Sequence, residues 1–470
     1  MSETPNVSRR DLLRRAAAAS LLASPAAGLL AACATSTGGG NNNQGGGTKT
    51  ANNPLGMKED GEVNVVIFNG GYGDRYAKEV HEPMFTRAFP NAKITHKSSQ
   101  AISTELAPLF AAGNPPEFVN NSGEKSMDFG QLVSEGQLMD LTELLDAPSV
   151  HDPNKKVRET LVPGTVEVGS FDGKPLVLYY VSTVFGIWYN GKLFKDKGWT
   201  APTSWDAFVK LCGDIKAAGV TPYAYAGANA AYYQWNVILT GAAKLGGSEV
   251  LKAIDNLQPN AWTNEHVKNS AAMWAEIGSK FMNKAHEGLR HTEVQLQQNQ
   301  DKVAFYPSGD WLENEQKADT PAGFEYQLMP VPVSGKLGAA GVRATAGEGY
   351  FVSAKSKNPR GGLEYMRRML SLEGGKGFTN IVKAPTVVLG ASDGFAFPPG
   401  VSSSQAALKA AGKDVVNLFF DGDYKDLDQE ARAATNELMF GRINADAWAT
   451  RIQKKADAIA ADSSIKKFKR

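Results

Sequence analysis

The sequence predicts an α/β protein made of two lobes. Strand patterns alternate with helix patterns along residues 63–119. About 410 residues follow a glycine- and asparagine-rich segment that ends near residue 57, and this length is too great for one ordinary core. Further strand and helix patterns continue beyond residue 176, so a second lobe has elements of its own.

The first lobe begins with a parallel α/β unit. The pattern predicts a strand at 63–68, a helix at 75–89, a strand at 93–96, a helix at 103–112 with Ser103 as its cap, and a strand at 117–119. Short connections in this order are typical of parallel sheets. Ligands bind beyond the carboxyl ends of such strands, so the rule selects the loops 69–74 and 120–123.

The remaining elements follow in order along the chain. Helices are expected at 127–135, 141–145, 204–218, 235–244, 264–279, 292–300 and 445–461, and strands at 176–181, 185–189, 303–306, 324–330 and 349–352. No repeat period is present.

The first 33 residues predict export with a lipid anchor. Arg9 and Arg10 lie in a basic region of the kind read by the twin-arginine system, and a short alanine-rich run ends at Cys33. Leucine, two alanines and a cysteine resemble a lipobox, whose cysteine is acylated. The alternatives are an ordinary cleaved signal peptide with a chance cysteine and a transmembrane anchor, for which the run is short. Residues 1–33 are therefore predicted to be a lipoprotein signal peptide and 34–57 a flexible linker.

Composition excludes several classes of function. The chain has 50 basic and 49 acidic residues and a formal net charge of +1, with no basic stripe for a nucleic acid. Phosphate-binding, dinucleotide-binding, zinc-protease and serine-hydrolase motifs are absent from the sequence, so we expect no cofactor and no metal. Residues 421–423 (DGD) suggest calcium, but Lys425 stands where a third oxygen ligand is needed. Cys212 lies in a helical pattern and is expected to be a buried apolar residue.

Several motifs then resemble one family in a fixed order. They are AAGNPPEFV at 111–119, GKPLVL at 173–178, WYN at 188–190 with KLF at 192–194, GWTAPTSW at 198–205, GDW at 309–311 and GEG at 347–349. Together they resemble the carbohydrate class of extracellular solute-binding proteins of ABC importers, the maltose-binding-protein-like group. The stretches 70–74, 147–153, 253–257 and 309–316 are similar to one actinobacterial branch, the lipoproteins of N-acetylglucosamine and N,N'-diacetylchitobiose importers.

The resemblance implies a periplasmic-binding-protein-like fold with two hinge-linked lobes and a central ligand cleft. It places the N-terminal lobe at 58–181 plus 350–385 and the C-terminal lobe at 182–349 plus 386–470. The third crossing between lobes is expected near residues 384–388. It also implies a monomeric, lipid-anchored protein on the extracellular face of the cell membrane. Such a protein captures a sugar and delivers it to the transmembrane subunits of an ABC permease.

A sugar has apolar faces and a girdle of hydroxyls, so its site needs flat aromatic rings and fixed polar groups. Trp311 follows a strand end where the family places a stacking tryptophan, and Tyr232 and Tyr233 match an aromatic segment of the family; a packing role is the alternative for all three. The polar candidates are Tyr72 and Asp74 in the first loop, Asn120 and Ser122 after the third strand, Thr183 at the first crossing, and Asp310 and Glu348 near the cleft edges. The alternative to ligand contact is a turn-capping role for Asp310 and a hinge-supporting role for Glu348.

Two other functions use the same architecture. A secreted glycoside hydrolase acting on amino-sugar oligomers needs two cleft carboxylates, for which Glu313 and Glu348 are the conceivable pair. A receptor-like sensor differs only in its partner.

Overall fold

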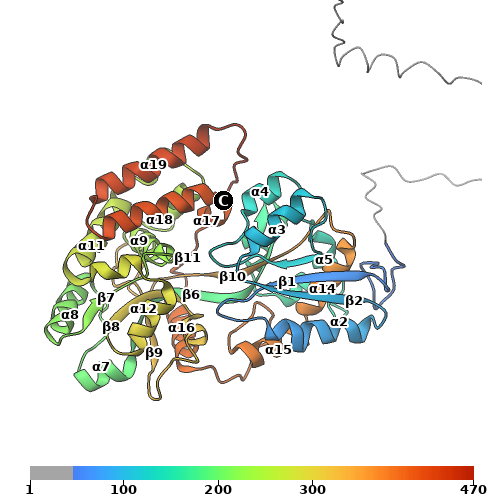
Figure 1. Ribbon diagram of the computed structural model, residues 1–470, viewed down its shortest axis with the longest axis horizontal. Helices are drawn as coiled ribbons and strands as arrows, with labels where there is room; N and C mark the ends of the chain where they lie inside the picture. Colours follow the sequence, from blue (N-terminus) through green and yellow to red (C-terminus); the bar gives the residue numbers. More distant parts are fainter. Residues whose placement is uncertain (1–45) are drawn as a thin grey trace, which may run out of the picture. The chain divides into compact units, whose positions relative to one another are not determined.

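The computed structural model describes residues 46–470. The predicted signal peptide, the lipidation site Cys33 and linker residues 34–45 lie outside the described residues. Figure 1 shows the described elements, with the helices of the first lobe around β1 and β2 and those of the second lobe around β7, β8 and β9.

One nine-stranded sheet runs through both lobes in the order β2-β1-β3-β10-β6-β8-β7, with β9 on β6 and β11 on β10. Its strands are β1 (Glu62–Phe68), β2 (Lys93–Ser99), β3 (Phe118–Asn120), β6 (Leu178–Asn190), β7 (Thr221–Tyr223), β8 (Val303–Gly309), β9 (Tyr326–Met329), β10 (Val342–Val352) and β11 (Val415–Val416). β4 (Ser170–Phe171) and β5 (Lys174–Pro175) form a separate hairpin. As predicted, β1 is parallel to both β2 and β3.

Two long strands carry the chain between the lobes. β6 and β10 are antiparallel, with Thr183 opposite Thr345 and Val181 opposite Gly347. One end of the pair is bonded to β3, while the other end of β6 is bonded to β8 and β9. The two strand runs predicted at 176–181 and 185–189 are therefore a single strand, because residues 182–184 continue the hydrogen-bonded ladder.

Helices cover both faces of the first-lobe sheet. They are η1 (Ala77–His81, a π-helical turn), α2 (Glu82–Ala88), α3 (Ile102–Ala111), α4 (Phe129–Ser134), α5 (Thr142–Asp146), η2 (Val157–Thr160), α6 (Thr165–Val168), α14 (Pro359–Met369) and α15 (Leu372–Val382). Alternate residues of β1 enter different cores: Val65 and Ile67 pack with α2, α14 and α15, and Val66 packs with α3. The predicted cap at Ser103 is wrong, because α3 begins at Ile102 without a side-chain cap.

The second lobe is mostly helical. Its helices are α7 (Gly191–Lys197), α8 (Trp205–Ala217), α9 (Ala231–Gly246), α10 (Glu249–Asp255), α11 (Glu265–Phe281), η3 (Lys284–Gly288), α12 (His291–Asn299), α13 (Leu312–Glu315), α16 (Pro399–Ala411), α17 (Phe420–Asp423), α18 (Lys425–Met439) and α19 (Ala445–Ala461). α9 lies at their centre and is buried along almost its whole length. Cys212 is buried in this core, as predicted.

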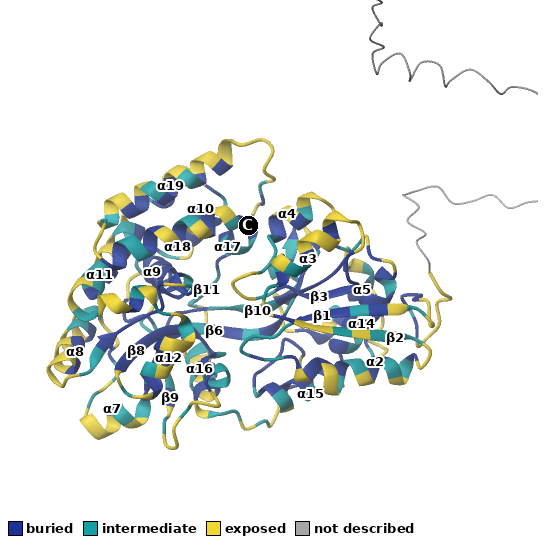
Figure 2. Ribbon diagram, viewed as in Figure 1, coloured by how far each residue is buried: buried dark blue, intermediate teal, exposed yellow. Residues whose placement is uncertain are grey.

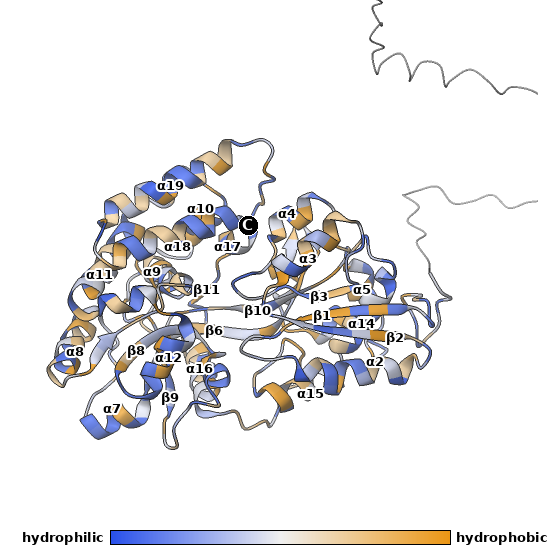
Figure 3. Ribbon diagram, in the orientation of Figure 1, coloured by the Kyte–Doolittle hydropathy of each residue, from blue (hydrophilic) through white to orange (hydrophobic). Residues whose placement is uncertain are grey.

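The strands form the interior of both lobes. β1, β3 and β8 are mostly dark blue in Figure 2, whereas β2 at the edge of the sheet is largely exposed. The helices turn exposed residues outward, and the apolar residues of β1 and β3 are orange in Figure 3. One buried cluster lies within the first lobe and another within the second. The largest cluster continues from the second lobe into the first, where the rings of Phe171 and Phe468 lie 5.1 Å apart.

Two predicted boundaries differ from the structure. The linker was predicted to reach residue 57, but Leu55 and Met57 are fully buried against the first lobe and Asn53 donates to the carbonyl of Met57 at 2.9 Å. These two apolar side chains draw the segment onto the body of the protein. The first lobe also continues beyond 385, because Val387 donates to the carbonyl of Tyr180 and packs in the first-lobe core. The third crossing therefore follows Ala391.

No helix within residues 46–470 has the length and apolar character that crossing a membrane requires.

Candidate functional site

A cleft of about 900 Å³ lies between the lobes. Its floor is the crossing part of β6 and β10, and its walls include the loops after β1 and β3, the start of α9, the start of α13 and the segment around α17. The volume is near the upper end of the range for small-molecule sites, so the cleft has room for more than one sugar ring. Both loops that the strand-end rule selected, 69–74 and 120–123, line it.

The second lobe presents a cluster of aromatic rings to the cleft. The ring of Trp311 lies 5.9 Å from that of Tyr233 and 5.5 Å from that of Phe185, and Tyr232 lies 4.2 Å from Tyr233. The indole nitrogen of Trp311 donates to the Tyr233 hydroxyl at 3.4 Å. Trp311, Tyr232 and Tyr233 all line the cleft, so the structure brings together the three predicted stacking residues.

Glycines explain how Trp311 reaches this position. β8 ends at Gly309, where a Cβ would lie 1.9 Å from the folded-back indole ring, so a side chain at this position would displace the tryptophan. Across the cleft, a Cβ on Gly71 would lie 3.4 Å from Trp311, and the carbonyl of Gly71 accepts a hydrogen bond from Asn314 at 2.8 Å. The first-lobe loop therefore contacts the second lobe beside the tryptophan.

Both first-lobe loops of the cleft, 69–74 and 120–123, pack against the ring of Phe68. A Cβ on Gly70 or on Gly123 would lie 2.1 or 2.3 Å from the ring of Phe68, so both loops close over this ring only with glycine. Tyr72 lines the cleft, and its hydroxyl has no hydrogen-bond partner among residues 46–470. Burial, with the nearby carboxylates of Asp310 and Glu348, raises the pKa of Tyr72.

Asp74 does not share the orientation of Tyr72. Its carboxylate turns toward β2, where it lies 3.0 Å from His96 and 2.9 Å from Lys78, and it does not line the cleft. Although burial acts in the opposite direction, hydrogen bonds from Ser98, Lys78 and His96 lower the pKa of Asp74. The structure therefore gives this predicted site residue a role inside the first lobe.

Asn120, Ser122 and Glu348 form a hydrogen-bonded chain at the cleft floor. Asn120 donates to the Glu348 carboxylate at 2.8 Å, and Ser122 donates to the Asn120 carbonyl at 2.6 Å. Glu348 and Ser122 line the cleft, whereas Asn120 lies behind them, fully buried. Burial raises the pKa of Glu348 to about 7. Its backbone has a φ of 57°, a left-handed conformation that is uncommon for a residue other than glycine.

Thr183 and Asp310 belong to the crossing region. Thr183 lines the cleft, but Asp310 lies beneath it, where its carboxylate accepts from the Val184 amide and the Ser404 hydroxyl, both at 3.2 Å. Burial raises the pKa of Asp310 to about 7. Of the two carboxylates that a hydrolase would need, Glu348 lines the cleft but Glu313 does not. The Glu313 carboxylate accepts a hydrogen bond from the Gly400 amide instead.

Charged side chains that the sequence did not single out as site residues complete the cleft. The principal ones on the second-lobe wall are Arg343, Asp421, Asp423, Asp428, Arg432 and Arg470. The guanidinium of Arg432 lies 4.5 Å from the centre of the Tyr232 ring and bonds to Asp428 at 2.8 Å, so it fixes this ring. The sequence pattern at residues 421–423 suggested calcium only; within residues 46–470 no group of acidic, histidine or cysteine side chains has the arrangement of a metal site.

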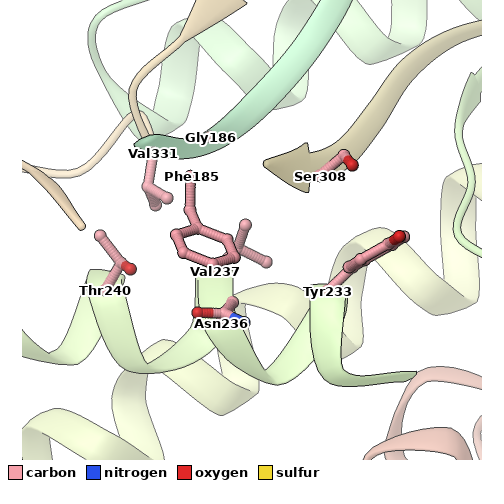
Figure 4. Close-up of a pocket in the computed structure, with 8 residues that line it drawn as sticks. All are labelled: Phe185, Gly186, Tyr233, Asn236, Val237, Thr240, Ser308 and Val331. Atoms are coloured by element: carbon pink, nitrogen blue, oxygen red, sulfur yellow. The ribbon is translucent and has the colours of Figure 1, made fainter. Parts of the chain in front are cut away.

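A second, much smaller cavity lies behind the aromatic wall. Figure 4 shows Phe185 of β6 pointing toward α9, with Asn236 and Val237 beneath it and Ser308 of β8 to one side. Its volume of about 10 Å³ suits one water molecule and excludes a sugar. The Ser308 hydroxyl is buried there without a partner among the described residues.

Comparisons with known proteins agree with this architecture. Residues 70–376 match the family described as bacterial extracellular solute-binding protein. Diacetylchitobiose binding protein NgcE of Streptomyces coelicolor is 32% identical over 428 residues, which cover 90% of this chain and 90% of that relative. The multiple sugar-binding protein of Streptococcus mutans is 25% identical over 366 residues, covering 76% of this chain and 81% of the relative.

Solved structures give the same fold. A chitin oligosaccharide binding protein superposes with a TM-score of 0.69 at 20% identity, covering 84% of this chain and 98% of its own. The predicted two-lobed α/β fold and the predicted family are confirmed. The matched family consists of binding proteins, not enzymes. This chain belongs to the bacterial extracellular solute-binding protein family.

Proposed function

We propose that this protein captures N-acetylglucosamine or N,N'-diacetylchitobiose and delivers it to an ABC permease. The observation that carries the proposal is the half-buried indole of Trp311, held by Tyr233 and Phe185 at the wall of an interlobe cleft. A flat ring fixed in this way suits the apolar face of a sugar. The polar side chains of Tyr72, Ser122 and Glu348 lie on the first-lobe side and the floor, where they suit the hydroxyls.

The charges of the cleft favour an uncharged ligand. Its lining contains seven acidic and seven basic side chains, apart from one histidine, so neither sign dominates. An anionic or cationic sugar would add a charge of its own that this balanced lining does not compensate on closure. N-acetylated amino sugars are neutral, and the relative from Streptomyces coelicolor is named for diacetylchitobiose. Both observations support this ligand class.

The proposal includes a closing motion about the crossing strands. β6 and β10 connect the lobes, and Gly347 and Gly349 flank Glu348 in the crossing part of β10. Sugar contacts to Trp311 on one side and Tyr72 on the other would favour the closed form, because only that form satisfies both. The protein acts as a monomer, held by acylated Cys33 at the extracellular face of the cell membrane.

Isothermal titration calorimetry tests this function. The purified protein is titrated with N-acetylglucosamine, N,N'-diacetylchitobiose, longer chitin oligomers, cellobiose and maltose. We expect saturable heat with the N-acetylated sugars and weaker or absent heat with the others. Absence of heat with every sugar would reject the proposal, and a preference for maltose would reject the ligand class.

A further inference from the structure

Two charged side chains on the second-lobe wall, Asp421 and Arg343, have polar atoms without a hydrogen-bond partner among the described residues. Asp421 lines the cleft, and among residues 46–470 the polar contact that its carboxylate makes is a long ion pair with Arg343. Its nearest cation is Arg343, with 3.8 Å between the guanidinium nitrogen and the carboxylate oxygen, which is too long for a hydrogen bond. The Asp421 side chain is 31% exposed, so ligand atoms can reach it.

Arg343 is held from several sides. Its guanidinium lies 4.4 Å from the centre of the Phe185 ring and 5.8 Å from that of Trp235, and it donates to the Asn236 side chain and to the Leu418 carbonyl. The side chain is only 5% exposed, yet its Nε–H has no partner among the described residues. Phe185 and Asn236, two of the residues that hold it, are seen in Figure 4. This cation is therefore fixed and lies beside Asp421.

Asp421 is also fixed by its neighbours in the chain. The amides of Phe419 and Phe420 both donate to the buried carboxylate of Asp255 at 2.8 Å. Two residues after Asp421, Asp423 accepts from the side chain of Arg470 at 2.8 Å. The short α17 segment is thus anchored on both sides of Asp421, and the Asp421 carboxylate meets the cleft with no hydrogen bond from the residues between 46 and 470.

We infer that Asp421 accepts a hydrogen bond from an O–H or N–H of the bound sugar and that Arg343 is a positioning residue for this carboxylate. A ligand hydrogen supplies the donor that Asp421 lacks, while the Arg343 charge keeps the carboxylate in place across 3.8 Å. The nearby hydroxyl of Tyr179, 3.8 Å from the position of a Cβ on Gly422, adds a donor on the floor beside it. The inference deepens the proposed function and rests on it.

Calorimetry with N,N'-diacetylchitobiose tests the role of Asp421. We expect Asp421→Asn to weaken binding about tenfold, because asparagine keeps an acceptor oxygen but loses the negative charge. Asp421→Ala should weaken it by about 10- to 100-fold, because the acceptor is lost as well. The matched control is Asp426→Asn, which makes the same charge change nearby on a side chain that is 72% exposed and outside the cleft. This control should bind within about twofold of the wild type.

A double-mutant cycle tests the role of Arg343. If Arg343 acts through Asp421, the losses of sugar affinity caused by Arg343→Met and by Asp421→Asn are not additive. The double variant then has about the same affinity as whichever single variant binds the sugar less tightly. Additive losses overturn the positioning role. Thermal unfolding checks that each variant is folded, and the Asp421 series decides the main claim without the arginine variants.

The failures are distinguishable. A wild-type protein that binds no sugar overturns the proposed function and this inference with it. A wild-type protein that binds N,N'-diacetylchitobiose, with Asp421→Asn and Asp426→Asn equal to it, overturns only the inference.

Discussion

Replacing Trp311 by alanine is expected to weaken sugar binding by about 2 kcal/mol, or about 30-fold in Kd. The side chain is half-buried, and its ring is fixed by Phe185 at 5.5 Å, by Tyr233 at 5.9 Å and by its own hydrogen bond to the Tyr233 hydroxyl. Because the ring is already ordered, stacking on it costs little side-chain entropy.

The magnitude follows from the area of one ring face. Covering one face of an indole with a sugar face removes about 100 Å² of apolar surface from water, counting both partners, which corresponds to about 2.5 kcal/mol. Incomplete coverage lowers this value to about 2 kcal/mol. Trp311 lines the cleft and Gly71 lies close to its Cδ1, so the area is worked out for one sugar ring stacked on the indole.

The assay is calorimetry with N,N'-diacetylchitobiose, with thermal unfolding as the test of folding. Trp311→Phe keeps a smaller ring and should lose less affinity than Trp311→Ala. Trp199→Phe is the matched control, because Trp199 is also half-buried but packs against Phe194 and does not line the cleft. A folded Trp311→Ala variant with wild-type affinity would refute the stacking role.

Three further results are expected. Burial raises the pKa of Glu348 to about 7 from an ordinary value of 4.5, so between these values the folded state keeps a proton that the unfolded state loses, and this contribution to stability falls as the pH rises. The unfolding temperature of Glu348→Gln should therefore rise relative to that of the wild type between pH 5 and pH 8. A difference that does not depend on pH would contradict the assignment. Asp74→Ala should lower the unfolding temperature, because it leaves the half-buried His96 without one of its two carboxylates, while sugar affinity stays within about twofold; a large loss of affinity would return Asp74 to the binding site. Cys33→Ser should release the protein from membranes in a fractionation experiment, and continued tight association would argue against the lipid anchor.

The sequence was sufficient to predict those elements whose structure depends on the local pattern of apolar and polar residues. The alternation of apolar residues placed β1 within one residue, and the amphipathic pattern placed α19 at its observed limits, 445–461. The strand-end rule found both first-lobe loops of the cleft because the carboxyl ends of β1 and β3 are adjacent in a parallel sheet. The turn after β8, with the family motif at 309–311, directed attention to Trp311, which lines the cleft; its role in sugar binding stays a prediction.

The remainder depends on contacts between distant segments. The direction of Asp74 is decided by His96 on β2, which a loop sequence does not reveal. Arg343 and Asp421 come from β10 and α17, 78 positions apart in the chain, and tertiary packing, including that of α17 against Asp255, brings them to one wall. Asp310 was predicted to lie at the cleft edge because it is polar. Its carboxylate instead accepts hydrogen bonds from the Val184 amide and the Ser404 hydroxyl, which hold it beneath the cleft floor.

The most direct test of the central claim is a crystal structure of the protein with N,N'-diacetylchitobiose. The proposed function requires an intact disaccharide between the lobes, with one ring against Trp311 and polar contacts to both walls. A disaccharide bound outside the cleft, or one inside it that leaves Trp311 uncovered, would contradict this account.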